Sequence, residues 1–493
     1  MTKRYSIAVD LGASGGKMAV GMFDGKKIGL NDYFAFGNVP VDLRGTLYWD
    51  IFGLYKSILE GFSRYGAKFG AAETVAFDTW GATYGLLDKK GRLLEPIYHY
   101  RDSRTEHTLA DMYRVIPRRK LFELTGCQCA RTYTLPQLYS CVLSKDPCLE
   151  NAEELLLLPD LLGYFLTGIK TTEMTIAGTS ALLDKTQERW SPEITKVFSI
   201  PPRLLTEIVG PGTVKGDVSP KIAAEAGLGN VRLTATVSHD SAAAVASIPG
   251  FGPDKLYISI GTNVSMGIER GEPLISDAAF AAGFKNTGGM GNKKIVYRDF
   301  AAFWIINELR REWSKQHVSC SFDDLHRLAG QAKSVNSYID PENPAFNSSQ
   351  GDMRQKIKSY LEETGQPVPT TVGEFVRCVF ESIAMKIKYS ADCLKNDMGV
   401  PLTEAFAING GARNALLVQM ISDALGIRVK AGLPHATLAG NLLTQLISQG
   451  EISSLAQMRE VSANSFQMAE YDPSPSKDWD LELHRAVEKH IFG

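Results

Sequence analysis

The chain has 493 residues, of which 44% are hydrophobic and 22% charged, as in an ordinary globular protein, so a disordered or fibrous chain is not expected. Its 53 lysines and arginines against 55 aspartates and glutamates leave a formal net charge of −2, and no basic run stands out, which argues against a nucleic-acid partner. The length exceeds the needs of one ordinary domain and predicts two or more.

The N-terminus leads directly into an apolar run, with neither the apolar core nor the cleavage site of a signal peptide. The most apolar stretch, residues 155–166, is too short to cross a bilayer, and we expect it to form a buried helix. The seven cysteines follow no disulfide or zinc spacing and favour free thiols in a reducing compartment. These features predict a cytoplasmic protein without membrane contact.

A loop of small residues follows the first predicted strand. Apolar runs over 6–12 and 17–23 predict two strands, and the glycine spacings of a P-loop or a dinucleotide fingerprint are missing between them. The turn consists of four small residues, Ala13, Ser14, Gly15 and Gly16. Such a turn can direct several backbone N–H groups at one anion, with Lys17 or the Ser14 hydroxyl as a further donor. The alternative is a plain hairpin.

Asp10 lies near the end of the first predicted strand. A carboxylate there would repel a bare phosphate, so its place beside a phosphate loop makes sense with a divalent cation between the two. Mg²⁺ suits such a site because it combines one or two carboxylates with phosphate oxygens and waters. We therefore predict that Asp10 handles a magnesium ion.

A helical pattern over 54–70 precedes a strand predicted over 74–81. That strand ends on three residues that suit a sugar through stacking, close approach and hydroxyl contact: Asp78, Trp80 and Gly81. Arg101 follows in the charged segment YRDSRT and adds a donor, and from there to residue 200 the pattern is mostly helical. The alternatives are a core tryptophan and a surface cluster of ion pairs.

A histidine and an aspartate stand at a later junction of strand and helix. The run over 232–240 predicts a strand that leads into a helix, with His239 and Asp240 at the junction. A helix N-terminus stabilises the anionic carboxylate, so Asp240 could accept a proton from an attacking hydroxyl. The alternative is that Asp240 only caps the helix, the most frequent role of aspartate there.

The second half of the chain repeats the plan of the first. Two glycines and two prolines within residues 247–255 mark a domain boundary, and the sequence LYISIGTNVSMGIERGE after it again gives an apolar run, a glycine, small polar residues and an apolar run. Gly261, which Thr262 follows, takes the place of Gly12. The repetition predicts two related α/β halves with a ligand between them.

A glycine pair follows a later strand, within residues 405–426. Gly410 and Gly411 let the backbone approach a ligand closely at the start of a helix. Asn414 either caps that helix or bonds a nucleobase or ribose.

Six motifs in this order resemble the FGGY family of carbohydrate kinases, and within it the rhamnulokinases most closely: VDLGASGGK, FDTWG, YRDSRT, SHDSA, SIGTN and NGGARN. The resemblance covers about residues 4–455. It implies an α/β fold of two actin-like (ribonuclease H-like) domains, whose cleft closes on ATP and a sugar. It implies a sugar-binding domain over 1–247 and a nucleotide-binding domain over 254–455, and it says little about a tail over 456–493.

The resemblance also implies an activity. It is that of a kinase that uses ATP and Mg²⁺ to phosphorylate the C1 hydroxyl of a 6-deoxy ketohexose, L-rhamnulose first, with L-fuculose or another ketose such as xylulose or ribulose as the alternative. Asp240 would accept the hydroxyl proton, residues 13–17 and Thr262 would contact phosphates, and Gly81 and His239 would touch the sugar. The protein would be a monomer or homodimer of rhamnose metabolism.

Two positions depart from the rhamnulokinase pattern. Asp299 stands where those enzymes place an asparagine as a sugar contact, and Asn307 stands at a nucleotide-side position where glutamine is expected. The segment 171–184 is more similar to fuculokinases. A carboxylate at Asp299 can only accept hydrogen bonds when ionised, so the exchange could move specificity between stereoisomeric sugars.

Two other kinds of activity fit the fold that the resemblance implies. One is a non-catalytic, actin-like ATP-binding switch, and the other is a phosphatase or ATPase in which water replaces the sugar. His239 and Asp240 at the cleft speak against a pure switch, which has no need of them. ATP consumption that requires a sugar would distinguish a kinase from an ATPase.

Overall fold

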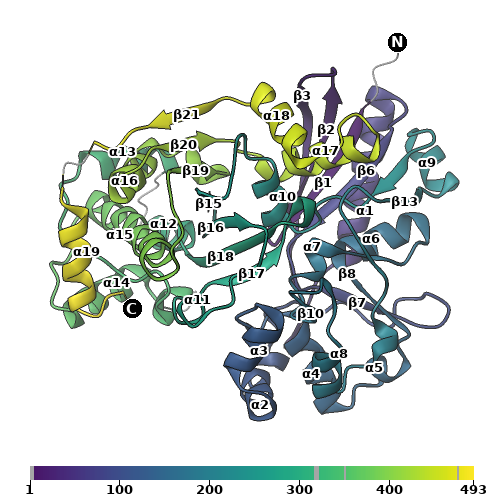
Figure 1. The fold of residues 1–493 in the computed structure, drawn as a ribbon, viewed down its shortest axis with the longest axis horizontal. Helices are drawn as coiled ribbons and strands as arrows, with labels where there is room; N and C mark the ends of the chain where they lie inside the picture. Colours follow the sequence, from purple (N-terminus) through teal and green to yellow (C-terminus); the bar gives the residue numbers. More distant parts are fainter. Residues whose placement is uncertain (1–4, 316–320, 349–350, 475–476, 493) are drawn as a thin grey trace.

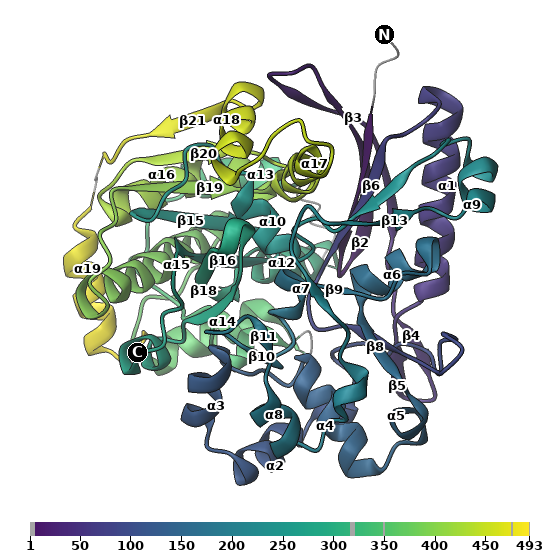
Figure 2. The ribbon, with the colours of Figure 1, turned by 45° about the vertical axis from the view of Figure 1, so that its right-hand side comes forward.

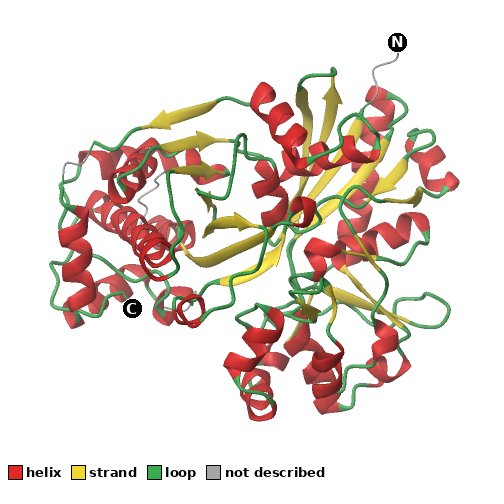
Figure 3. Cartoon of the chain, viewed as in Figure 1, coloured by secondary structure: helices red, strands yellow, loops and turns green. Residues whose placement is uncertain are grey.

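Two mixed β-sheets form the framework of the protein. The computed structural model describes residues 5–315, 321–348, 351–474 and 477–492 (Figure 1). The first sheet has six strands in the order β13-β14-β6-β1-β2-β3, and the second has seven in the order β17-β18-β16-β15-β19-β20-β21. Figure 3 shows helices packed around both sheets, as expected for an α/β chain of this length.

The first sheet opens with the predicted strand–turn–strand. Its strands are β1 (Ser6–Gly12), β2 (Gly15–Phe23), β3 (Ile28–Gly37), β6 (Thr74–Thr79), β13 (Val214–Asp217) and β14 (Arg232–Thr234). β1 pairs antiparallel with β2, which places Lys17 opposite Asp10, and parallel with β6, which places Asp78 beside Asp10. The helices α1 (Ile51–Phe69), α6 (Leu158–Thr167) and α9 (Pro220–Ala226) belong to this half.

The second sheet repeats this arrangement. Its strands are β15 (Lys255–Ile260), β16 (Asn263–Arg270), β17 (Lys285–Gly288), β18 (Lys294–Ala301), β19 (Glu404–Ile408), β20 (Val429–Gly432) and β21 (Met468–Tyr471). The order β6-β1-β2-β3 corresponds to β19-β15-β16-β18, with the same parallel and antiparallel pairings. The predicted recurrence is therefore confirmed. Its helices are α11 (Asp277–Ala281), α12 (Phe303–Lys315), α13 (Phe322–Gln331), α14 (Met353–Glu363), α15 (Val372–Asp392), α16 (Ala415–Leu425) and α19 (Trp479–Glu488).

A helical layer connects the two sheets (Figure 2). It contains α10 (Asp240–Ala246), α17 (Ala436–Ser448) and α18 (Leu455–Ser465). One buried cluster takes Ala8 and Ala19 from the first sheet, the alanines of α10, the leucines of α17, and Tyr257 and Phe406 from the second sheet. At Gly440 of α17, an added Cβ would lie 1.9 Å from the Ala243 carbonyl oxygen of α10, so glycine lets the two helices touch backbone to backbone.

The remaining N-terminal elements lie between β3 and β14 in the chain. Helices there are α2 (Thr108–Val115), α3 (Arg118–Thr125), α4 (Thr134–Ser144), α5 (Pro147–Asn151), α7 (Met174–Ala177) and α8 (Pro192–Val197). Four short strand pairs accompany them: β4 (Val41–Leu43) with β5 (Thr46–Tyr48), β7 (Tyr84–Leu87) with β8 (Glu154–Leu157), β9 (Thr172–Glu173) with β12 (Ile208–Val209), and β10 (Leu183–Asp184) with β11 (Arg189–Trp190).

Three local expectations need correction or extension. The stretch 155–166 does not form one helix, because its first leucines pair with β7 as strand β8 and only the part from Leu158 is helical. The strand expected over 232–240 ends at Thr234, since the following residues leave the sheet to reach α10. The segment 456–493 adds the edge strand β21 to the second sheet and packs α19 against α15 and α16.

Candidate active site between the two sheets

A polar pocket of about 460 Å³ is lined by both halves of the chain. Six of the predicted site residues line it: Trp80, Gly81, Arg101, His239, Gly261 and Asp299. It also contains residues that the sequence did not single out, chiefly Tyr133, Lys285 and Tyr297. No motif or spacing distinguishes these three, because a lysine or tyrosine in a strand or loop carries no signal until the chain is folded.

Asp240 is the first residue of α10, and His239, not Asp240, holds the N-cap position. The Asp240 carboxylate accepts a hydrogen bond from the Ser241 hydroxyl at 3.1 Å and lies 3.6 Å from the Nε2 atom of His239. Burial raises the pKa of Asp240, while His239 and the Ser241 N–H lower it. His239 is buried and Asp240 half-buried, and Asp240 is not among the lining residues although its neighbours His239 and Ser241 are.

Two carboxylates, Asp10 and Asp78, stand near the ends of β1 and β6. Asp78 is fully buried, and its Oδ2 atom accepts a hydrogen bond of 2.6 Å from the Asn441 amide of α17. Burial and then the charge of Asp10 raise the pKa of Asp78 well above its ordinary range. Burial and then the charge of Asp240 raise the pKa of Asp10 to about 6, although the Lys17 ammonium acts in the opposite direction.

Asp78 lies beside Asp10 on the neighbouring strand, and neither residue is among those that line the pocket. Asp78 Oδ1 is a buried oxygen without a hydrogen-bond partner in the described part of the chain. Two adjacent carboxylates with raised pKa values suit a divalent cation, whose charge would lower both. The residues present therefore fit the predicted magnesium ion.

The two small-residue turns differ in how tightly they are packed. Ala13 and Ser14 are exposed, whereas an added Cβ at Gly16 would lie 2.3 Å from the Phe36 ring, so this glycine serves packing. The side chain of Asn38 donates to the Gly12 carbonyl at 3.2 Å and supports the turn from behind. In the second half, the Thr262 carbonyl accepts from two backbone N–H groups at the start of α12, which fixes the turn.

The two glycines that follow β19 differ in the space around them. An added Cβ at Gly410 would meet nothing within 4 Å, whereas at Gly411 it would lie 2.3 Å from Ile260. Asn414 caps α16, because its side chain accepts from the Leu417 N–H, while its buried amide nitrogen has no partner among the described residues. Asn307 is half-buried on α12.

Asp299 forms a half-buried ion pair with Lys285 in the pocket wall. Its carboxylate lies 2.7 Å from the Lys285 ammonium, which also stands 4.9 Å above the ring of Tyr297. Although burial lowers the pKa of Lys285, the carboxylate of Asp299 raises it above its ordinary value. This wall of the pocket therefore carries a paired charge at the position where an asparagine was expected from the resemblance.

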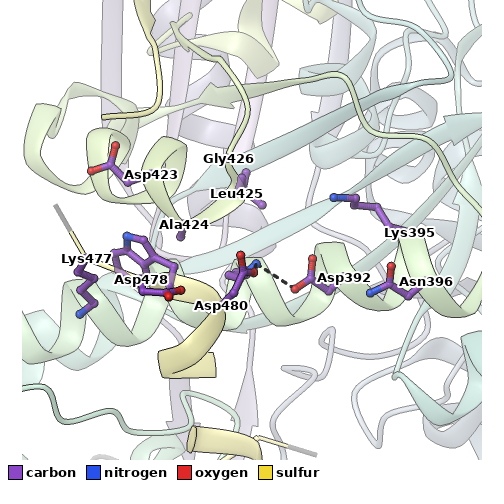
Figure 4. Close-up of a pocket in the computed structure, with 12 residues that line it drawn as sticks. Asp392, Lys395, Asn396, Asp423, Ala424, Leu425, Gly426, Lys477, Asp478 and Asp480 are labelled. Atoms are coloured by element: carbon purple, nitrogen blue, oxygen red, sulfur yellow. Dashed lines mark ion pairs between the residues drawn. The ribbon is translucent and has the colours of Figure 1, made fainter. Parts of the chain in front are cut away.

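A larger cavity of about 800 Å³ lies at α15, α16 and α19 and holds none of the predicted site residues (Figure 4). Its lysine Lys388 is already paired with Asp392 at 3.1 Å and Asp480 at 2.6 Å, so it has little free charge to attract a phosphate. The six cysteines that the structure describes are free thiols, as expected, and Cys320 lies outside the described residues. No helix within the described residues is long and apolar enough to span a membrane.

Comparisons with known proteins agree with this geometry. Models of the FGGY family of carbohydrate kinases match twice, the N-terminal domain over residues 5–246 and the C-terminal domain over 256–449. The chain is 33% identical to a rhamnulokinase of Bacteroides thetaiotaomicron over 97% of this chain and 98% of the relative. It is 30% identical to the rhamnulokinase of Bacillus subtilis over 94% of this chain and 95% of the relative.

Solved structures of sugar kinases share the fold. The xylulose kinase from Rhodospirillum rubrum has a TM-score of 0.81 at 14% identity, over 99% of each chain. The Plasmodium falciparum glycerol kinase with ADP has a TM-score of 0.80 at 16% identity, over 100% of this chain and 99% of that one. These matches confirm the predicted pair of actin-like domains.

Proposed function

The chain belongs to the FGGY family of carbohydrate kinases and is a sugar phosphotransferase, and on that premise we propose that it transfers the γ-phosphoryl group of ATP to the C1 hydroxyl of L-rhamnulose. ATP is the phosphate donor of this family. The identity to proteins named rhamnulokinase, over nearly the whole chain, supports the choice of sugar.

The observation that carries the proposal is the position of Asp240. Its carboxylate stands at the N-terminus of α10, next to His239 and Ser241, both of which line the pocket. In this role the Asp240 carboxylate accepts the proton of the ketose hydroxyl as the oxygen attacks the γ-phosphorus. The helix N-terminus favours the anionic carboxylate that this step requires.

The other site residues position the reactants. Trp80, Gly81, Arg101, His239 and Asp299 hold the sugar. Backbone N–H groups of Ala13, Ser14, Gly15, Gly16, Gly261 and Thr262, together with Lys17, receive the phosphates, and Asn307, Gly410, Gly411 and Asn414 border the nucleoside. Asp10, backed by Asp78, holds the magnesium ion, which when bound neutralises phosphate charge.

On this assignment residues 1–247 supply the sugar side, residues 254–455 supply the nucleotide side, and residues 456–493 complete the second half. Catalysis would then consist of positioning and charge neutralisation in a cleft that excludes water. The identity of the sugar depends on the pocket wall. The Lys285–Asp299 pair presents a fixed donor and a fixed acceptor, an arrangement that L-fuculose or another ketose could also use.

The test measures ADP release from Mg–ATP with a panel of ketoses: L-rhamnulose, L-fuculose, L- and D-xylulose, L- and D-ribulose, glycerol and no sugar. We expect L-rhamnulose to stimulate release most strongly. If another ketose stimulates release most strongly, the protein is still a sugar kinase, but L-rhamnulose is not its preferred substrate.

The base assignment has its own test in Asp240→Asn. We expect this variant to lose about 10²- to 10⁴-fold in kcat, the range of general-base catalysis, while its affinity for ATP stays near that of the wild type. Turnover within threefold of the wild type would show that Asp240 is not the base.

A further inference from the structure

We propose that Glu173 and Thr175 are positioning residues for Asp240, since they hold the backbone of the segment that ends in it. The inference rests on the proposed role of Asp240 as the base. Glu173 is fully buried at the start of α7, 65 residues away from Ser238 in the chain. None of the sequence motifs that predicted the site includes it.

Two consecutive N–H groups in front of Asp240 bond to this pair. The Ser238 N–H donates to Glu173 Oε2 at 3.2 Å, and the His239 N–H donates to the Thr175 hydroxyl at 3.2 Å. That hydroxyl in turn donates to Glu173 Oε2 at 2.6 Å. The segment has left the sheet at Thr234, and these bonds, together with the bond from Thr79 N–H to the Ser238 carbonyl, hold its last two residues before Asp240.

The side chain of Glu173 is longer than helix capping requires. Its carboxylate caps α7 by accepting from the N–H groups of Thr175 at 2.9 Å and Ile176 at 3.1 Å, a task for which serine, threonine, aspartate and asparagine are preferred. A shorter side chain would cap the helix but would not extend to Ser238. The additional methylene group is what joins the cap to the segment.

The network also carries an electrostatic cost. Within the described residues no lysine, arginine or histidine forms an ion pair with Glu173, and burial raises the pKa of Glu173 to about 7 against the effect of its donors. The nearest charged pair stabilises only its backbone, because Asp160 accepts from the Glu173 N–H at 3.2 Å and pairs with Lys215 at 2.8 Å. Burying a carboxylate whose only partners are neutral donors costs desolvation free energy, which a neutral serine or threonine cap would avoid. This cost indicates that Glu173 does more than cap α7.

Conservative variants test separately the side-chain length of Glu173, its charge and the hydroxyl group of Thr175. Glu173→Asp keeps the charge and the cap but loses the contact with Ser238, and Thr175→Val removes the partner of His239. Thr175→Ser restores that partner. Ser191→Ala is the matched control, because Ser191 is a buried cap, accepting from the Ile194 N–H at 3.3 Å, on α8 outside the site.

We expect Glu173→Asp to lower kcat by about 100-fold and Thr175→Val by about tenfold, with KM for ATP unchanged, as for a misplaced catalytic group. Thr175→Ser should restore kcat to within about twofold of the wild type, and Ser191→Ala should lower only the melting temperature. If Glu173→Asp and Thr175→Val keep wild-type kcat and lose stability as Ser191→Ala does, Glu173 is a structural cap and the inference is wrong.

Hydrogen exchange gives a readout without turnover. In Glu173→Asp and Thr175→Val we expect the amides of Ser238 and His239 to exchange at least about tenfold faster than in the wild type, with the core of the second sheet unchanged. Unchanged exchange at these two amides would overturn the inference. Faster exchange combined with a fully active Asp240→Asn would instead refute the base assignment and leave the network in place, so the two failures are distinguishable.

Discussion

Neutralising Asp10 should stabilise the folded protein at the expense of its activity. Burial and the nearby Asp240 raise the pKa of Asp10 from 3.8 to about 6. A carboxyl group whose pKa is higher in the folded chain takes up a proton on folding, so the free energy of unfolding falls as the pH rises from about 4 to about 6. Asp10→Asn removes this penalty, because the amide stays neutral at every pH.

The magnitude follows from the shift. About two pKa units at 1.36 kcal/mol each give a gain of about 3 kcal/mol in the free energy of unfolding above pH 7. About half of this gain should remain at pH 5 and about a fifth at pH 4, where the wild-type carboxyl is protonated in the folded state and partly protonated in the unfolded state.

Urea unfolding of the wild type and of Asp10→Asn at pH 7.5, 5 and 4 measures this difference, with the Mg²⁺ dependence of turnover recorded alongside. Asp24→Asn is the matched control. Asp24 is an exposed carboxylate whose pKa is lowered by the backbone N–H groups of Lys27 and Lys26, so its neutralisation should not stabilise the fold. The reasoning is refuted if Asp10→Asn is no more stable than the wild type at pH 7.5, or if the gain at pH 4 equals the gain at pH 7.5.

Two further substitutions test the packing and the pocket. Gly440→Ala should cost about 1–3 kcal/mol of stability and also lower kcat, because its Cβ would push α17 away from the helix that carries Asp240. Gly271→Ala, which meets nothing within 4 Å, is the control, and equal melting temperatures for the two would contradict the close contact. Asp299→Asn should change the ratio of kcat/KM for L-rhamnulose and L-fuculose by about tenfold, with KM for ATP unchanged, since Lys285 loses its ionic partner. A ratio equal to that of the wild type would exclude Asp299 from specificity.

The local pattern was sufficient for the two hairpins and the helices that follow them. Alternating and continuous apolar runs are set by the chain itself, and the strands β1, β2, β15 and β16 lie where those runs predicted them. The local pattern gave the wrong structure for the start of the stretch 155–166, because a run of leucines fits a buried strand and a buried helix equally well. Pairing with β7 makes its first leucines a strand.

The candidate site divides in the same way. Asp10, His239 and Asp240 could be selected from the sequence because they stand beside small-residue turns or at the start of a helix. The roles of Asp78 and Asn414 could not be predicted from the sequence. A side-chain oxygen that contacts a ligand and one that bonds to another part of the protein have the same local sequence pattern. The structure places Asp78 against Asn441, 363 positions away, and gives Asn414 to the cap of α16.

The sequence by itself determined the α/β class, the repeated hairpin plan, the phosphate-type turns and the resemblance to sugar kinases, because each depends on residues that are neighbours in the chain. Only the tertiary structure decided which groups distant in the chain meet: Lys285 with Asp299, Asp10 with Asp78, and Glu173 with the Ser238 N–H. These pairs join segments between 14 and 68 residues apart. Their closeness arises from sheet pairing and helix packing, which no local pattern records.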